Sequence, residues 1–314
     1  MSEKIHLNIN ASSLRASSCL LHWWRVIHEG YSEKIFNNKI VYGIAGHKYF
    51  DTAYKTGNLP LAKEEAFKVF DQPKVCKETK DEHFSDRGHF NYICYDVWTN
   101  YASVDGSFQL LLKPDGSPAT EVTFSIPYYD DGIISVNLCG TIDKIGRIKG
   151  GGWAIGDWKF TGFWDTKQFL ASFAMASQLR FYALSLKLMA RHFPQSQLGE
   201  IGATNFGAFI DGIFIKPKVS ECAVKRSDVF QMKDEIIADF EASLLRRIKQ
   251  LSAAIADGTV LQKEGILMNT CQLKYHPCSF YIPCSANNTA IELMMLEREF
   301  KQQEYDPLNR DKEI

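Results

Sequence analysis

The sequence predicts an α/β fold in which a mixed sheet is flanked by helices. Helical patterns fill the N-terminal third of the chain, and segments rich in β-branched and aromatic residues follow and then alternate with long helical segments. Segments in this order typically form a sheet covered by helices. The chain has 314 residues, of which 45% are hydrophobic, so it can bury the core that such a fold needs.

The N-terminal third predicts four helices. Ser12 and Ser13 are typical of a helix start, and they precede an apolar segment over 16–28. Three further helices are expected at 41–54, 61–70 and 87–101. We therefore expect the first hundred residues or so to be helical.

A predicted hairpin lies at the centre of the chain. Strands are expected first at 108–112 and 120–127. The segments 133–148 and 153–160 are separated by Lys149-Gly150-Gly151-Gly152, which favours a turn and cannot extend a strand. These two segments are therefore expected to pair as a hairpin.

The C-terminal half predicts a long helix at 166–192, a strand at 206–215, a second long helix at 228–256 and a final helix at 289–302. We expect one compact domain with four parts. These are a helical N-terminal region at 1–105 that contains Cys19 and His47, a core at 106–260, a cysteine-rich region with the final helix at 261–300, and a tail at 301–314.

Charge and hydropathy exclude several classes of protein. The net charge of −1 excludes a strongly basic protein, so a nucleic acid would have to be held by a local patch. The first ten residues lack the apolar stretch of a signal peptide, and charged residues interrupt the most apolar long segment, at 169–193. We therefore expect a cytoplasmic protein with no membrane partner, in which the eight cysteines do not form structural disulfides.

The predicted hairpin carries two carboxylates and an amine that can meet on one face. Side chains alternate along a strand, so Asp157 and Lys159 point the same way, and Asp143 on the neighbouring strand can meet Asp157. Carboxylates favour Mg²⁺ or Mn²⁺, and an amine beside them can orient water or stabilise charge on a phosphate. Each motif alone occurs often without such chemistry. Their order on a hairpin, followed by Gln178 and Tyr182 on one helix face, favours a catalytic site.

In this order the motifs resemble those of a known nuclease family. Gly140-Thr141-Ile142-Asp143, Asp157-Trp158-Lys159 and Gln178-x3-Tyr182 are similar to motifs of the RecB-like PD-(D/E)xK nucleases. Gly43-Ile44-Ala45-Gly46-His47 is similar to the upstream histidine motif of that family. The resemblance implies a restriction-endonuclease-like core at 106–260.

The resemblance also implies a role for each matching residue. His47, Asp143 and Asp157 would bind Mg²⁺ or Mn²⁺, and Lys159 would position the attacking water. In the same way Gln178 and Tyr182 would support the substrate. Glu121, on the preceding strand, is a candidate outer-sphere acid.

Three cysteines close together, Cys271, Cys278 and Cys284, lie in a proline-containing segment and favour a metal site, with Cys19 as the fourth ligand. This distribution resembles the iron–sulfur branch of the family, which includes the AddB nuclease domain and CRISPR-associated RecB-like exonucleases. The resemblance implies a 4Fe–4S cluster that joins the two ends of the chain. Zinc, with His276 able to replace one thiolate, and ordinary buried thiols remain alternatives.

The expected function is hydrolysis of DNA phosphodiester bonds, and the resemblance implies an exonuclease acting on single-stranded ends. The alternative is a nucleic-acid-binding or assembly subunit of a recombination or CRISPR-adaptation complex. The chain has no helicase motif, so a helicase or recombination partner protein would have to unwind duplex DNA. Trp23 and Trp24 are expected to pack near the cysteines, or alternatively to stack on single-stranded bases.

Overall fold

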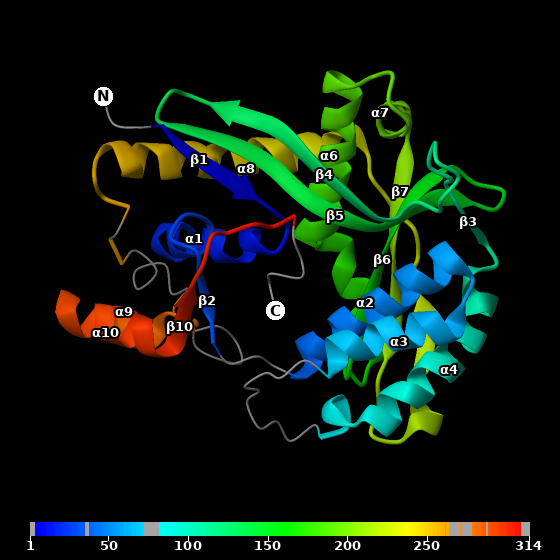
Figure 1. Ribbon diagram of the computed structural model, residues 1–314. Coiled ribbons are helices and arrows are strands. Elements are labelled where there is room, and N and C mark those ends of the chain that lie inside the picture. The colour runs from blue at the N-terminus through cyan, green and yellow to red at the C-terminus, as the bar shows by residue number, and fades with distance from the viewer. Residues whose placement is uncertain are drawn as a thin grey trace. The chain divides into compact units, whose positions relative to one another are not determined.

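The computed structural model describes residues 4–34, 38–71, 82–260, 262–263, 271, 278–286 and 288–308, without the side chains of 82, 99–100 and 102–105 (Figure 1). The chain forms two compact units, and each unit combines segments that are far apart in the sequence. Unit 1 comprises Met1–Lys34, Thr123–Gly140 and Glu235–Ile314, and unit 2 comprises Ile35–Val122 and Thr141–Asp234. The boundaries of these units differ from the four consecutive ranges expected from the sequence.

Unit 2 contains the mixed sheet that the sequence predicts. The end of β5 (Ile134–Ile148) pairs antiparallel with β6 (Trp153–Thr161), with Lys144 opposite Gly156, so the predicted hairpin is confirmed. β6 pairs parallel with β7 (Phe206–Phe214) along nine residues. Three short strands complete this part of the sheet by antiparallel pairing, namely β3 (Phe108–Leu110) on β5, and β8 (Ala223–Arg226) and β9 (Phe230–Gln231) on β7.

Three helices cover one face of this sheet. They are α2 (Asn38–Thr56), α3 (Leu59–Phe70) and α4 (Arg87–Asp105), with the short η2 (Glu82–Ser85) before α4. Their apolar side chains form one core cluster with Trp158 of β6 and Ile213 of β7. The three helices expected in this region are therefore confirmed, and they run a few residues longer than expected.

The opposite face is covered by α5 (Thr166–Ala171), α6 (Ser177–His192) and α7 (Gln197–Gly202). Every residue of β7 is buried, as expected of a strand with helices on both faces. The single helix expected at 166–192 is wrong, because η3 (Ser172–Met175) and an extended Ala176 interrupt it. No residue of η3 is buried, so no core packing holds this stretch in α-helical geometry.

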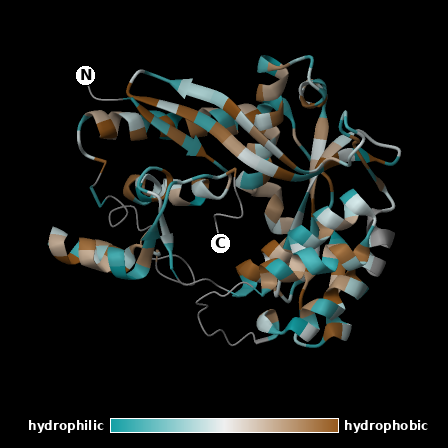
Figure 2. Cartoon of the chain, in the orientation of Figure 1, coloured by the Kyte–Doolittle hydropathy of each residue, from teal (hydrophilic) through white to brown (hydrophobic). Residues whose placement is uncertain are grey.

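In unit 1, β1 (Ile5–Ile9) pairs parallel with the start of β5, and β4 (Thr120–Asp130) also pairs with β5. Figure 2 shows apolar and polar residues alternating along β1, as in a half-buried strand. β2 (Tyr31–Glu33) pairs antiparallel with β10 (Phe300–Gln302). The expectation of an entirely helical N-terminal region is therefore wrong, because the strands β1 and β2 lie within it.

The helices of unit 1 begin with η1 (Ser13–Ser18) and α1 (Leu20–Ile27), which occupy the first predicted helix. α8 (Asp234–Ala256), α9 (Tyr281–Ser285) and α10 (Thr289–Glu299) follow. α8 starts six residues later than expected, after β9, and η4 (Val219–Glu221) precedes β8. Among the described residues, no helix combines the length and the hydropathy needed to cross a membrane.

A buried ion network crosses the sheet of unit 2. The side chains of Lys144 and Asp211 are completely buried, and the ammonium of Lys144 donates to Asp211 and to the Tyr101 hydroxyl. Arg226 donates to both carboxylate oxygens of Asp211, at 2.7 and 2.8 Å. Burial alone would raise the pKa of Asp211, but Lys144 and Arg226 outweigh that effect and hold the pKa below its ordinary value.

This network makes unit 2 sensitive to one substitution. Asp211→Asn is expected to lower the free energy of unfolding by about 3–5 kcal/mol at neutral pH, because Lys144 would remain charged and buried without its counter-ion. The pKa of Asp211 is lower in the folded protein than its ordinary 3.8, so the stabilisation is present above that pH. This stabilisation is lost as the pH falls through the pKa of Asp211 in the folded protein. The difference in free energy of unfolding between wild type and variant should therefore shrink only in that acid range.

Urea unfolding curves of both proteins, measured from neutral pH down to the acid transition, test this expectation. Asp71→Asn serves as the control, because that carboxylate is 42% exposed in its ion pair with Arg87 and should change stability by less than about 0.5 kcal/mol. An Asp211→Asn protein as stable as the control would contradict the expected role of the network.

Candidate metal centres

The predicted carboxylates and amine meet at the β5–β6 hairpin of unit 2. Asp157 and Lys159 lie on the same face of β6, and the Lys159 Nζ is 2.6 Å from the Asp157 Oδ2. The Asp143 Oδ2 accepts a hydrogen bond of 2.7 Å from the backbone N–H of Trp158, which places it beside Asp157. Both carboxylates are 1% exposed. The expectation that these three side chains converge is therefore confirmed.

His47 joins them from α2. Its Nδ1 lies 3.5 Å from the Asp143 Oδ2 and 3.3 Å from the Glu121 Oε1. The neighbouring residue, Gly46, explains this approach, because a Cβ there would lie 2.2 Å from the ring of Phe160 on β6. Only glycine lets α2 come so near the strand, and the next side chain along the helix then reaches the carboxylates.

Glu121 has a more direct place in the site than the sequence predicts. Its oxygen, the Asp143 oxygen and a ring nitrogen of His47 all lie within 4.8 Å of one another, so these three residues could hold one cation. Glu121 is also the one non-glycine residue with a positive φ, 45°, in the part of the chain that the structure describes. Such a backbone conformation is costly for a residue with a side chain and is concentrated at functional sites.

The electrostatics of this group suit a divalent cation. Burial lowers the pKa of His47, but Asp143 and Glu121 outweigh that effect and raise it to about 9. Burial also raises the pKa of Asp157, which Lys159 partly offsets and Asp143 reinforces. The negative charge of the three carboxylates thus exceeds the positive charge that His47 and Lys159 supply. The oxygen and imidazole donors suit Mg²⁺ or Mn²⁺.

Gln178 and Tyr182 contact the site through Asp157. The Gln178 Nε2 donates to the Asp157 Oδ1 at 2.8 Å and to the Tyr182 hydroxyl at 3.0 Å. The other oxygen, Oδ2, lies in the ion pair with Lys159 and is buried without a hydrogen bond from the described residues. The pair on α6 therefore orients a carboxylate, and the expected support of the substrate remains a prediction.

The second group of predicted ligands lies in unit 1. Cys19, Cys271, Cys278 and Cys284 line one small cavity, together with His22, Phe280 and Tyr281. Cys278 donates its backbone N–H to the Cys271 carbonyl at 2.9 Å. The residues that the structure describes include no three cysteine sulfurs that all lie within 4.8 Å of one another. His276, the alternative ligand, lies outside the described residues.

The four thiols affect one another electrostatically. Burial raises the pKa of Cys278, and the thiols of Cys284, Cys19 and Cys271 raise it further. Several thiolates in one cavity repel one another, and a bound metal removes that repulsion. The donor set therefore fits a thiolate-bound metal or cluster.

Two side chains on α1 that sequence reasoning missed contact these thiols. The His22 Nδ1 is 3.4 Å from the Cys278 Sγ, and burial lowers the pKa of His22 to about 4. Arg25 donates to the Cys284 Sγ at 3.3 Å and forms an ion pair with Glu292. The available signal was the spacing of Cys19, His22 and Arg25 three residues apart, which places them along one side of a helix.

The two adjacent tryptophans do not form a stacking surface for bases. Trp23 is fully buried and Trp24 is 8% exposed, so the alternative of base stacking is wrong. The Trp24 Nε1 donates to the Glu29 carboxylate at 3.1 Å, and its ring packs on His28. Both residues are part of the core of unit 1.

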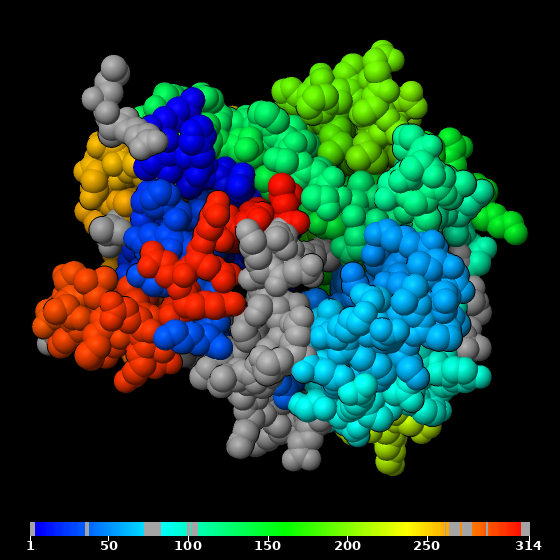
Figure 3. All heavy atoms as spheres, viewed as in Figure 1, coloured from blue at the N-terminus to red at the C-terminus, as the bar shows by residue number. Residues whose placement is uncertain are grey.

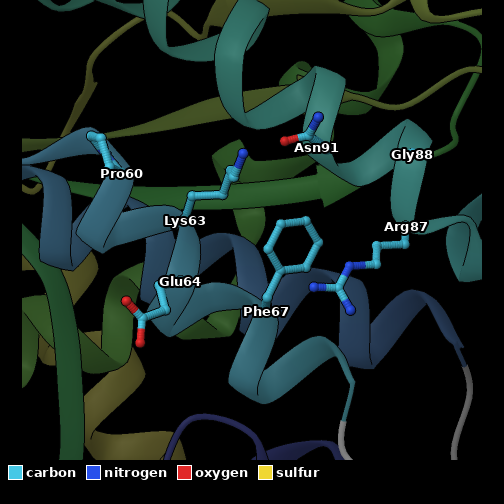
Figure 4. A pocket seen from close by; sticks show the side chains of 7 residues that line it. All are labelled: Pro60, Lys63, Glu64, Phe67, Arg87, Gly88 and Asn91. Atoms are coloured by element: carbon cyan, nitrogen blue, oxygen red, sulfur yellow. The ribbon is translucent and has the colours of Figure 1, made fainter.

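A shallow pocket between α3 and α4 holds none of the predicted site residues. Figure 3 shows these two helices at the surface, and Figure 4 shows the Phe67 ring between the side chains of Lys63 and Arg87. The Arg87 guanidinium lies 4.3 Å from the centre of that ring and pairs with Asp71. The Arg87 guanidinium is thus engaged locally, and we assign the pocket no function.

Comparisons with known proteins identify no family for this chain. No family model matches it, and no curated protein matches it significantly. One of the solved structures that match is described as "Crystal structure of SSO0001"; it is 11% identical, covers 70% of this chain and 76% of its own, and has a TM-score of 0.24. A similarity this low carries no argument about function, so the functional conclusion rests on the geometry of the two candidate centres.

Proposed function

We propose that this chain is a metal-dependent nuclease that hydrolyses phosphodiester bonds of DNA, with single-stranded ends as its substrate. One observation carries the proposal, namely the group formed by His47, Glu121 and Asp143 beside the ion pair of Asp157 and Lys159. The order of these motifs, which resembles RecB-like PD-(D/E)xK nucleases, supports the proposal independently of the geometry.

In this proposal His47, Glu121 and Asp143 hold the divalent cation, and Asp157 is the further predicted ligand. A bound Mg²⁺ or Mn²⁺ lowers the pKa of coordinated water and neutralises charge on phosphate oxygens. Gln178 keeps Asp157 in a fixed orientation, because it donates to one carboxylate oxygen while Lys159 lies at the other. A fixed orientation of this kind typically contributes 10- to 100-fold in metal affinity or activity.

Lys159 has the charge and the exposure to act on the substrate. Its side chain is 23% exposed while its partner Asp157 is buried, so the ammonium stands at the edge of the site. There it can orient the attacking water and stabilise the negative charge that builds up on the phosphate. Preorganised charge of this kind is typically worth about 10²–10³ in rate.

The first experiment measures release of nucleotides from a labelled single-stranded oligonucleotide with Mn²⁺. Lys159→Ala is expected to lower kcat by about 10²–10³-fold, and Asp143→Ala to lower activity at least as much, because it removes a cation ligand. Glu121→Gln is expected to weaken Mn²⁺ binding by at least about tenfold, since it removes one negative donor.

The matched controls are Lys68→Ala, which removes a lysine that is 58% exposed on α3, and Asp234→Asn, which removes a carboxylate that is 74% exposed. Both should cleave at the rate of the wild type. Equal cleavage by wild type, Lys159→Ala and Asp143→Ala would exclude this active site and favour a binding or assembly subunit.

We propose that the second centre is a structural 4Fe–4S cluster held by Cys19, Cys271, Cys278 and Cys284. The four residues share one cavity, which supports a common metal group. The resemblance to the iron–sulfur branch of the RecB-like nucleases favours a 4Fe–4S cluster over zinc, which the same four thiolates could also bind.

The second experiment measures iron, sulfide and zinc in anaerobically purified protein, together with its visible absorbance. The wild type is expected to be brown and to contain about four iron atoms per chain. Cys19→Ser and Cys284→Ser should lose most of the iron and the colour, and unit 1 should become less stable towards urea. Cys139→Ser is the control, because Cys139 is completely buried and does not line the cavity. A colourless protein with one zinc per chain would show that the centre binds zinc instead of a cluster. A protein that contains neither iron nor zinc would exclude a metal centre.

A further inference from the structure

Three large apolar side chains are exposed on the segment that joins β6 to α6, and neither candidate centre uses them. Trp164 is 72% exposed and Phe163 is 48% exposed, while Met175, at the other end of the segment, is 73% exposed. Large apolar side chains that are exposed together usually mark a binding surface. The segment belongs entirely to unit 2.

The exposed indole is held in place by a buried lysine. Lys216 is 5% exposed, and its ammonium donates to the Phe163 carbonyl at 2.7 Å. The same ammonium lies 4.1 Å from the centre of the Trp164 ring. A cation at this distance attracts the ring and orients it. The lysine therefore fixes both the backbone before Trp164 and the plane of its ring.

The rest of the segment is anchored on the sheet. Phe169 packs against Phe163 and Phe173, with ring centres 5.9 and 5.1 Å apart, and against Phe214 of β7 at 5.6 Å. The Phe163 ring therefore rests on Phe169, which in turn packs on Phe214 of the sheet. Side chains held in place before binding lose little conformational entropy when they bind a ligand.

Each end of the segment is a few residues away from a residue of the candidate active site. Phe163 follows Lys159 by four residues, so their Cα atoms can be at most about 14 Å apart. At the other end, Met175 precedes Gln178 by three residues, and Gln178 donates to Asp157. A ligand that reaches the catalytic carboxylates is therefore close to these apolar side chains.

The charges around the segment suit an anionic ligand. Arg180 donates to the sulfur of Met175 at 3.0 Å, and Lys225 donates to Thr166 at 2.9 Å. Lys167 is exposed on α5. The single acidic residue between 162 and 176 is Asp165, whose carboxylate caps α5 by accepting the Gln168 N–H.

We propose that Phe163, Trp164 and Met175 form a stacking surface for the unpaired bases of a single-stranded nucleic acid, whose backbone follows the surrounding lysine and arginine side chains. Every base offers a flat apolar face to an aromatic ring, whereas the bases of a duplex are already stacked and paired. Cleavage of the bound strand rests on the function proposed above, but binding of the strand does not.

The test measures binding of a fluorescently labelled oligothymidylate by anisotropy, in EDTA so that no strand is cut, at one salt concentration. Trp164→Ala is expected to weaken binding about 5- to 140-fold, which corresponds to about 1–3 kcal/mol per stacked base at 1.4 kcal/mol per tenfold change. Trp164→Phe keeps a ring and should recover most of that loss. Intrinsic tryptophan fluorescence should be quenched by the oligonucleotide in the wild type, and the quenching should be much weaker in Trp164→Phe.

Phe193→Ala is the matched control, because Phe193 is also exposed, at 51%, but lies after the end of α6. This variant should bind the oligonucleotide as tightly as the wild type does. Thermal unfolding of each variant verifies that it is folded. Unchanged affinity in Trp164→Ala, an equal loss for a duplex of the same length, or a wild type that binds no oligonucleotide would each overturn the stacking surface. The first two results leave the nuclease proposal unaffected, and the Lys159→Ala and Asp143→Ala assays judge that proposal separately.

Discussion

The register of the β5–β6 hairpin determines how the polar groups of unit 2 are distributed. Lys144 lies opposite Gly156, and a Cβ at that glycine would be 2.5 Å from the Lys144 side chain. The buried ammonium therefore requires glycine across the strand pair, and Asp211 then neutralises it. A shift of one residue would exchange the two faces, so Asp143 would be removed from the candidate site and Lys144 would lose Asp211. One ion pair and one glycine thus keep the face that carries the candidate site correctly oriented.

Buried charge is compensated differently on the two faces of this hairpin. Asp211 faces Lys144 and Arg226, so its negative charge is compensated by protein groups alone. At the candidate site, by contrast, several carboxylates share the positive charges of His47 and Lys159. The raised pKa of His47 is the consequence, because a proton on its ring partly balances the carboxylates. Because the protein's own cations do not neutralise all the carboxylates, a bound divalent cation would stabilise this site.

The sequence predicted the parts of this site that depend on local periodicity. Asp157 and Lys159 are two residues apart on a strand, and their common face follows from alternation alone. Glu121 was underestimated because its position depends on a positive φ that no sequence pattern indicates for glutamate. The break at Ala176 was also missed, since apolar residues continue through 166–192 and only tertiary packing distinguishes its helices. Contacts such as Arg25 with Cys284 join residues 259 positions apart, and a single sequence does not reveal them.

Unit 1 shows why a thiolate-bound cluster would be structural. Its segment around Cys278 and Cys284 contributes little apolar surface, because the local core consists of Phe280, Leu296 and Phe300 with a few partly buried neighbours. A core of this size supplies little stability by itself, and small cores are commonly supplemented by metals. A group bound to Cys19 as well would link α1 to this segment across more than 250 residues of chain. The ordering of both segments would then depend on the free energy of metal binding, which in such sites contributes directly to folding.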